Sequence, residues 1–391
     1  MSIFAAVMTG RGTGAISTIQ LFGDKADTVI KRIFKPATGK PPALKPGKIL
    51  LGAISDADKI IDQVVIGCEG NNSFAINCHG NPLIVEMIMR LLRKEGAELI
   101  TTEQLLAKSL TQEKHNALTI EAKLAMLNAK TLEGTKIIVN QIESGLSKKA
   151  AQWLQNIKAL SLDEITKNVE QILNASRTAT FIINGCTATI AGPPNSGKST
   201  LLNRLAGREK AIVTDIKGTT RDWVSAECRI GPLALTLIDT AGLDEKLTTS
   251  PKDAIEKAAQ QKSVEMLEQA DLILLVLDNN QTADQLDKKL IQKITGRKVL
   301  TILNKCDLPA GFDTENLPEI LGKPVRISAK FGNGIENLLK KIQDMMGVVR
   351  FDLTQPVCIT ARQQNLLEQL KQAKSKRKAA SIITELLNGH A

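Results

Sequence analysis

Hydrophobic and polar positions follow two different patterns along the chain. Between residues 185 and 345, short and largely apolar runs occur at 187–191, 233–238, 272–277, 299–303 and 325–327. Runs of this length and composition are typical of strands buried on both faces, as in a parallel sheet covered by helices. This region therefore predicts an α/β domain with a mostly parallel sheet.

The flanking regions have a helical period instead. From about Thr111 to Ser176 there is little glycine or proline, and the apolar positions mark helical faces: Leu118, Ile120, Leu124, Leu127, Ile142, Leu146, Trp153, Leu154 and Ile157. Ser161 followed by Glu164 predicts a capping box at a new helix start. After Pro356 the chain is helical again to its end. We therefore predict one helical domain, built from two segments, into which the α/β domain is inserted.

Residues 1 to about 106 mix short β-like runs at 15–21 and 64–66 with turns and one helix after Pro82. This mixture predicts a small α+β N-terminal domain. The predicted organisation is 1–106 for this domain, 107–184 and 346–391 for the two helical segments, and 185–345 for the α/β domain.

A glycine-rich loop follows the run at 187–191 and precedes an amphipathic segment. Residues 192–200 match G-x-x-x-x-G-K-[ST], in which glycine N–H groups and a helix N-terminus face a phosphate chain. Lys198 is predicted to reach the β- and γ-phosphates, and Ser199 to give its hydroxyl to Mg²⁺. A chance match to the pattern is the alternative. The predicted phosphate-side residues are Gly192, Asn195, Ser196, Gly197, Lys198, Ser199 and Thr200.

Polar motifs end three further apolar runs. Asp239 is placed to hold Mg²⁺ through water, and the Gly242 N–H to sense a γ-phosphate. The Asp307 carboxylate can accept from the N1–H and amino group of guanine, a donor pair that adenine lacks, so the nucleotide is predicted to be GTP. The predicted guanine-side residues are Asn304, Lys305, Asp307, Ser328, Ala329 and Lys330. Four motifs in this order predict a P-loop GTPase domain.

Composition adds few constraints. The net charge of +10 fits an RNA partner or a soluble basic protein equally, and six scattered cysteines form no C-x-x-C pair, which favours buried thiols in a reducing cytoplasm. No apolar run is long enough to span a membrane, and the first residues lack a signal-type core, so a cytoplasmic location is expected. A basic cluster is either an RNA contact or a solvated helix face: Lys371, Lys374, Lys376, Arg377 and Lys378.

The phosphate loop with Asn195, the segment 211–222 and the segment 239–243 resemble the MnmE (TrmE) family of tRNA modification GTPases. Segments 10–16, 72–80 and 118–122 resemble that family outside the GTPase motifs. The resemblance implies a homodimer through the N-terminal domain, tRNA as substrate and a flavin-dependent partner protein. It also implies that K⁺ takes the place of an arginine finger.

Site roles follow from the same resemblance. The implied K⁺ ligands are Asn195, Thr214, Ile216 and Thr219, and Thr220 joins Ser199 and Asp239 around Mg²⁺. Glu256 falls where the family orients the attacking water, with a solvated helix glutamate as the alternative. For Asn195 the alternative is an ordinary polar loop residue. The implied catalytic residues are Lys198, Thr220, Gly242 and Glu256.

The chain also departs from the family. Its tRNA-modifying members end in C-[IVL]-G-K, whereas this sequence ends Asn388-Gly389-His390-Ala391, and Cys358 is no positional substitute. The family's G-E-D segment, which serves formyl-tetrahydrofolate binding, is not recognisable, which argues against folate. Arg11, Asn72 and His79 are the remaining candidate folate contacts, with a structural turn histidine as the alternative for the last. Two functions stay open: wobble-uridine modification of tRNA, or a GTP-controlled switch or RNA/ribosome assembly factor without that chemistry.

Overall fold

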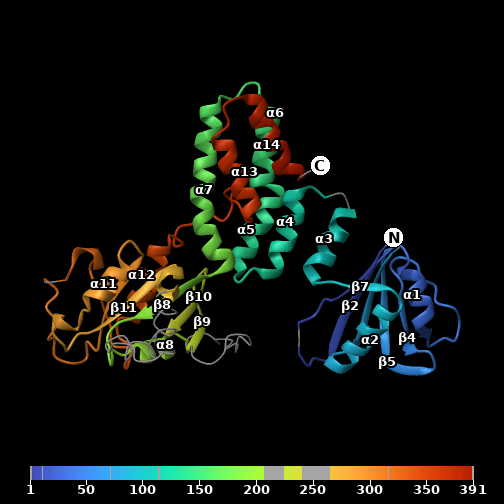
Figure 1. The fold of residues 1–391 in the computed structure, drawn as a ribbon, viewed down its shortest axis with the longest axis horizontal. Coiled ribbons are helices and arrows are strands. Elements are labelled where there is room, and N and C mark those ends of the chain that lie inside the picture. Colours follow the sequence, from blue (N-terminus) through green and yellow to red (C-terminus); the bar gives the residue numbers. More distant parts are fainter. Residues whose placement is uncertain are drawn as a thin grey trace. The chain divides into compact units, whose positions relative to one another are not determined.

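The computed structural model describes residues 2–10, 12–70, 72–112, 115–206, 224–239, 265–315 and 317–389 (Figure 1). The chain divides into two compact units, Met1–Asn116 and Ala117–Ala391.

The first unit is built on a seven-stranded sheet in the order β3-β4-β5-β6-β2-β1-β7. Its pairs are antiparallel except for β1 with β7. The strands are β1 Ile3–Val7, β2 Ile16–Gly23, β3 Phe34–Pro36, β4 Ile49–Asp56, β5 Lys59–Gly70, β6 Ser73–His79 and β7 Ala97–Leu99. The predicted runs at 15–21 and 64–66 thus lie in β2 and β5.

Alternation along these strands gives the sheet two different faces. Helices α1 (Ala26–Ile33) and α2 (Pro82–Lys94) share a buried apolar cluster with Ile66 and Ile76, which face the same side. Helix α3 (Thr102–Gln112) packs Leu105 against Ala6 and Phe22. These two residues follow Ala5 and Leu21 of the first cluster along their strands, so they face the other side of the sheet. Because of this packing the unit ends at Asn116, beyond the boundary that the sequence pattern placed near residue 106.

The second unit contains a six-stranded sheet in the order β13-β12-β11-β8-β10-β9, in which only the edge strand β9 is antiparallel to its neighbour. The strands are β8 Cys186–Ala191, β9 Val224–Ile230, β10 Leu233–Asp239, β11 Leu272–Asp278, β12 Val299–Asn304 and β13 Val325–Arg326. Described helices beside them are α8 Lys198–Ala206, α11 Lys288–Ile294 and α12 Ile335–Met346, with short 3₁₀ turns η2 Ala283–Gln285 and η3 Glu319–Leu321. Every residue of β11 is buried, as its continuous apolar run predicted.

Helices from both sides of this domain form a single bundle (Figure 1). The first segment supplies α4 Ala117–Ala125, η1 Met126–Asn128, α5 Leu132–Glu143, α6 Leu146–Gln155 and α7 Leu162–Asn184, and the second supplies α13 Ala361–Lys371 and α14 Lys376–Asn388. Trp153 and Ile172 share one buried cluster with Leu367 and Ile383. The predicted fold, an α/β GTPase-type domain inserted in a helical domain and preceded by a small α+β domain, is confirmed.

Two polar contacts fasten the halves of the bundle together. The buried Gln141 side chain accepts from the N–H groups of Leu146 and Val357, each at 2.9 Å, and so holds the segment that returns from the α/β domain. Arg362 of α13 pairs with Glu121 of α4 at 2.6 Å. The predicted capping box is also present, with the Glu164 carboxylate accepting from the Ser161 N–H at 2.8 Å.

No helix in the described part of the chain is both long and apolar enough to cross a membrane.

Candidate functional site

Parallel strands β8, β10, β11 and β12 end at one edge of the second sheet. The residues that follow or end these strands therefore come together there: Gly192, Asp239, Asp278 and Asn304. In open α/β sheets this carboxyl edge is where ligands bind.

The loop between β8 and α8 is wound tightly, and glycine is required at two of its positions. Gly192 has φ 143°, and a Cβ there would lie 2.0 Å from the carbonyl oxygen of Val276. Gly197 has φ 93°, and a Cβ there would lie 2.3 Å from Nδ2 of Asn304. Asn195 also has a left-handed backbone, with φ 60°, which asparagine tolerates better than most residues. The backbone thus gives a second reason for asparagine at this position.

Lys198 begins α8 and is 4% exposed. Its ammonium group donates to the carbonyl oxygens of Gly192 and Pro193, each at 2.8 Å, so the charge lies inside the curve of the loop. The hydroxyl of Ser196 is buried there and has no hydrogen-bond partner among the residues that the structure describes. Because an unpaired buried hydroxyl costs about 1–3 kcal/mol, a phosphate oxygen that accepts from it would be favoured. The loop therefore fits a phosphate chain.

Ser199 and Asp239 bring two hard oxygen ligands together. The Ser199 hydroxyl donates to Oδ2 of Asp239 at 2.7 Å, and Asp239 is largely buried. Mg²⁺ binds preferentially to hydroxyl, carboxylate and water oxygens. The pair therefore fits a magnesium site that the Ser199 hydroxyl would ligate directly and the Asp239 carboxylate would hold through water.

Asn304 connects the phosphate loop to the second motif of the site. Its Nδ2 donates to the carbonyl oxygen of Ser196 at 2.8 Å, and its Oδ1 accepts from the N–H of Ala329 at 2.9 Å. Lys305 has φ 63°, and its ammonium pairs with Asp278 at 2.7 Å. Asp307, which lies just beyond, is exposed. This leaves its carboxylate accessible to a purine edge.

The loop of Ser328, Ala329 and Lys330 has a partner that sequence reasoning missed. Arg204 of α8 donates from Nε to the carbonyl oxygen of Ala329 at 2.9 Å and from its terminal nitrogen to that of Lys330. The helix that begins with Lys198 thus holds the loop predicted to face guanine. No sequence spacing signals this contact, because the two partners are 125 residues apart.

The remaining site residues named from the sequence lie outside the described residues: Arg11, Thr214, Ile216, Thr219, Thr220, Gly242 and Glu256.

Comparisons with known proteins agree with this geometry. A family model described as "50S ribosome-binding GTPase" matches residues 187–305, and one described as "GTP-binding protein TrmE N-terminus" matches residues 3–103. The tRNA modification GTPase MnmE of Bacillus subtilis (strain 168) is 30% identical across 95% of this chain and 89% of its own length. The chain belongs to the MnmE family of tRNA modification GTPases.

A second relative and one solved structure are also similar to this chain. MnmE of Bacillus anthracis is 30% identical across 87% of this chain and 81% of its own. Among solved structures, the G domain of the T. maritima FeoB iron transporter is 28% identical, covers 41% of this chain and 98% of that one, and has a TM-score of 0.33. Residues 187–305, which match the GTPase family model, belong to the GTPase domain of this MnmE-family protein, which hydrolyses GTP.

Of the N-terminal candidates, the two that the structure describes, Asn72 and His79, are not brought together. His79 ends β6, with its side chain 67% exposed and its Nδ1 2.7 Å from Oδ1 of Asp62. Asn72 precedes the other end of this seven-residue strand, so the two are about 20 Å apart. The hydrogen bond with Asp62 supports the structural alternative for His79.

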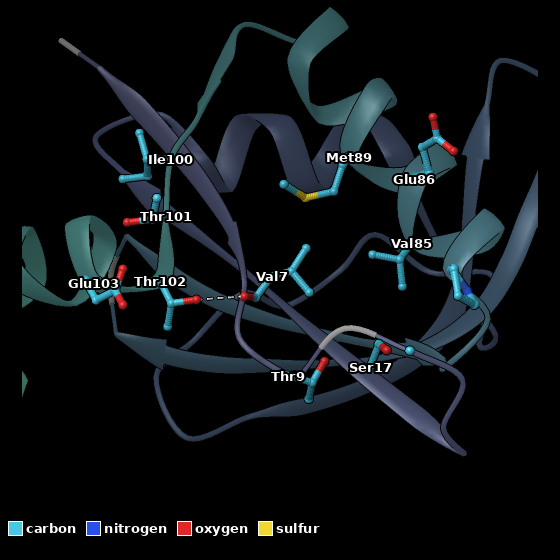
Figure 2. Close-up of a pocket in the computed structure, with 13 residues that line it drawn as sticks. Val7, Thr9, Ser17, Val85, Glu86, Met89, Ile100, Thr101, Thr102 and Glu103 are labelled. Atoms are coloured by element: carbon cyan, nitrogen blue, oxygen red, sulfur yellow. Dashed lines mark hydrogen bonds between the residues drawn. The ribbon is translucent and has the colours of Figure 1, made fainter. Parts of the chain in front are cut away.

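A cavity of about 770 Å³ lies elsewhere in the first unit, and Figure 2 shows its lining. Val85, Met89 and Ile100 give it apolar walls, while Glu86 and Glu103 contribute carboxylates. The Thr102 hydroxyl donates to the carbonyl oxygen of Val7 at 2.9 Å and anchors the start of α3 beside it. Neither Asn72 nor His79 lines this cavity, whereas Glu103, which sequence reasoning missed, does.

All six cysteines are free, and all but Cys306 are buried. Burial raises the pKa of Cys186, Cys228 and Cys358 to about 12. A thiol that keeps its proton is a poor nucleophile. These three side chains therefore serve packing.

Proposed function

We propose that this chain hydrolyses GTP with Mg²⁺ and K⁺ and uses that reaction in the modification of the tRNA wobble uridine. The observation that carries the proposal is the convergence of Lys198, Ser199, Asp239 and Asn304 at one sheet edge, in a chain of the MnmE family.

Hydrolysis of GTP needs charge stabilisation more than covalent help from the protein. Lys198 supplies a fixed positive charge beside the phosphates, and the first turn of α8 supplies N–H donors. Bound Mg²⁺ would neutralise charge on the β- and γ-phosphate oxygens, held by Ser199 and Asp239 with Thr220 as a further ligand. Gly242 is proposed to sense the γ-phosphate, and Glu256 to orient the attacking water.

For K⁺ we propose Asn195 as the side-chain ligand, together with Thr214, Ile216 and Thr219. Asn195 is exposed at the outer bend of the phosphate loop, so its amide oxygen can reach a cation beside the phosphates. Bound K⁺ would offset charge that develops in the transition state, the task of an arginine finger in other GTPases.

We propose a homodimer through the first unit. Ile49 and Leu51 of β4 are 75% and 61% exposed, and Val65, which is opposite Leu51 on β5, is exposed on the same face. Apolar side chains gathered on an open sheet face are typical of an interaction surface. A second copy that covers this face would bury them.

For formyl-tetrahydrofolate the cavity gives a better candidate than Asn72 and His79, neither of which lines it. A carboxylate can accept from the adjacent N–H and amino donors of a pterin ring, and Glu103 lines a cavity of about 770 Å³. We propose that any folate binds there and that Glu103→Gln weakens it, as calorimetric titration with the free cofactor would measure.

Wobble-uridine modification is proposed with a flavin-dependent partner protein, and it is tested by mass analysis of tRNA from a strain that lacks the gene. Loss of the modified nucleoside supports the proposal. Unchanged wobble uridines, together with intact GTP hydrolysis, would favour the second function, a GTP-controlled switch or assembly factor.

A further inference from the structure

The turn between α13 and α14 concentrates positive charge. Five of the eight residues 371–378 are lysine or arginine and none is acidic. The five, called here the basic turn, are Lys371, Lys374, Lys376, Arg377 and Lys378, and all are exposed.

Partners within the chain satisfy only some of these charges. Lys371 pairs with Glu170 of α7 at 2.9 Å, and Lys376 donates to the carbonyl oxygen of Lys158 at 2.6 Å. Across the described residues, no ion pair joins Lys374, Arg377 or Lys378 to a carboxylate. Three cations therefore face solvent on one short segment.

The position of these cations is unfavourable for the helix itself. The first turn of α14 contains Lys376, Arg377 and Lys378 and no acidic residue. The backbone dipole makes that end of a helix partly positive, so like charges there destabilise it. Helix α7 of the same bundle follows the favourable rule, with Asp163 and Glu164 in its first turn. An external anion would relieve the repulsion in α14.

The surface also has a shape and donors that suit a polyanion. A groove of about 350 Å³ lies beside the turn, and Gln369, Gln372, Lys374, Ser375 and Lys378 are among its lining residues. From Arg350 to Gly389 no large apolar side chain is exposed, so this surface lacks the apolar face that membrane-surface helices insert. Charge complementarity thus favours a hydrated phosphodiester backbone over a lipid surface.

We propose that the basic turn binds the phosphate backbone of RNA. The inference deepens the proposed function, because the RNA would be the tRNA substrate. Backbone contacts of this kind position an RNA without reading its sequence.

The test compares two triple variants that remove the same charge. The basic-turn variant combines Lys374→Gln, Arg377→Gln and Lys378→Gln. The control variant combines three substitutions on α11: Lys288→Gln, Lys289→Gln and Lys293→Gln. Binding of a labelled, unmodified tRNA transcript is followed by fluorescence anisotropy between about 50 and 200 mM KCl. Loss of three phosphate contacts should lower the slope of log affinity against log salt by roughly 2–3, with at least a tenfold weaker affinity at the low-salt end.

The control should keep the wild-type slope. Both variants should bind GTP normally, and the basic-turn variant should unfold at the same or a higher temperature, because it removes repulsion from the α14 terminus. Equal losses in the two variants, or no loss in either, would overturn the proposal. So would a loss confined to binding of phosphatidylserine vesicles, with tRNA binding unchanged.

A different result would show that the proposed tRNA function fails while the basic turn still binds RNA. If a hairpin RNA unrelated to tRNA binds through the basic turn while a deletion strain keeps its modified wobble uridines, the surface assignment stands and the tRNA role does not.

Discussion

Arg204 donates from Nε to the carbonyl oxygen of Ala329 at 2.9 Å and so joins the helix after the phosphate loop to the loop predicted to face guanine. The backbone of that loop, Ser328 to Lys330, is predicted to support the guanine O6, so loss of the Arg204 contact should weaken this interaction. Arg204→Ala should reduce the preference for GDP over the diphosphate of 2-aminopurine riboside, which lacks O6, by roughly fivefold, or about 1 kcal/mol.

Titration calorimetry of both nucleotides measures that ratio. Asn203→Ala, an exposed change on the same helix, is the matched control, and Arg204→Lys should behave like Arg204→Ala because an ammonium lacks the planar fork. An unchanged ratio in Arg204→Ala, whatever its overall affinity, would limit Arg204 to a structural role.

Asp307 is predicted to determine the base preference. Asp307→Asn should weaken GTP binding by about 1–3 kcal/mol, because the amide opposes a donor to the guanine amino group. The same amide complements the C2 carbonyl of xanthine, so binding of XTP should rise. Competition binding measures both, with Glu319→Gln, an exposed carboxylate on η3, as a control for charge. Comparable wild-type affinity for ATP and GTP would refute the assignment.

Asn195 should determine the response to K⁺. Wild-type hydrolysis of GTP is expected to be much faster in K⁺ than in Na⁺. Asn195→Gly should bring the two rates together, because glycine keeps the left-handed backbone and lacks the amide. Alanine is a poorer choice, since it adds backbone strain to the loss of the ligand. Equal wild-type rates in the two salts would remove the K⁺ site.

The buried thiols should be inert. Since burial raises the pKa of Cys186, Cys228 and Cys358 to about 12, iodoacetamide at pH 8 should leave them unlabelled in the native protein and label them after unfolding. Folding therefore favours their protonated forms. This stability contribution is complete below about pH 9 and is lost as pH rises toward 12.

Peptide mass mapping identifies which cysteines are labelled. The Cys358→Ser variant should retain GTP hydrolysis. Rapid labelling of native Cys358 at pH 8 would contradict its assignment as a packing residue.

Five of the six strands of the second sheet could be predicted, because strands buried within a sheet have largely apolar sequences. The antiparallel edge strand β9 was not predicted. The run at 272–277 coincides with β11, whose residues are all buried. The capping box was equally accessible, because Ser161 and Glu164 are local partners. In the first unit, by contrast, α1 and α3 were not predicted. These helices are 8 and 11 residues long, and helices this short are stabilised mainly by the sheet they cover.

In the candidate site, too, residues in local motifs could be predicted, whereas residues that act through distant contacts could not. Its motifs are local, so Lys198, Asp239 and Asn304 could be named from spacing alone. Arg204 could not, because its role exists only through contacts with a loop distant in the chain. For His79 the sequence left a folate contact and a structural turn histidine open, and its contact with Asp62, which is 17 residues away, could not be inferred from spacing. Glu103 was overlooked because nothing local marks a cavity wall.

The most direct test joins the nucleotide site to tRNA in the cell. Wobble uridines are analysed by mass spectrometry in tRNA from a deletion strain carrying the wild-type gene, Asp307→Asn, Glu319→Gln or no gene. The modified nucleoside is expected with the wild type and Glu319→Gln, and to be missing with Asp307→Asn and with no gene. Full modification in the deletion strain without the gene would contradict a role in tRNA modification.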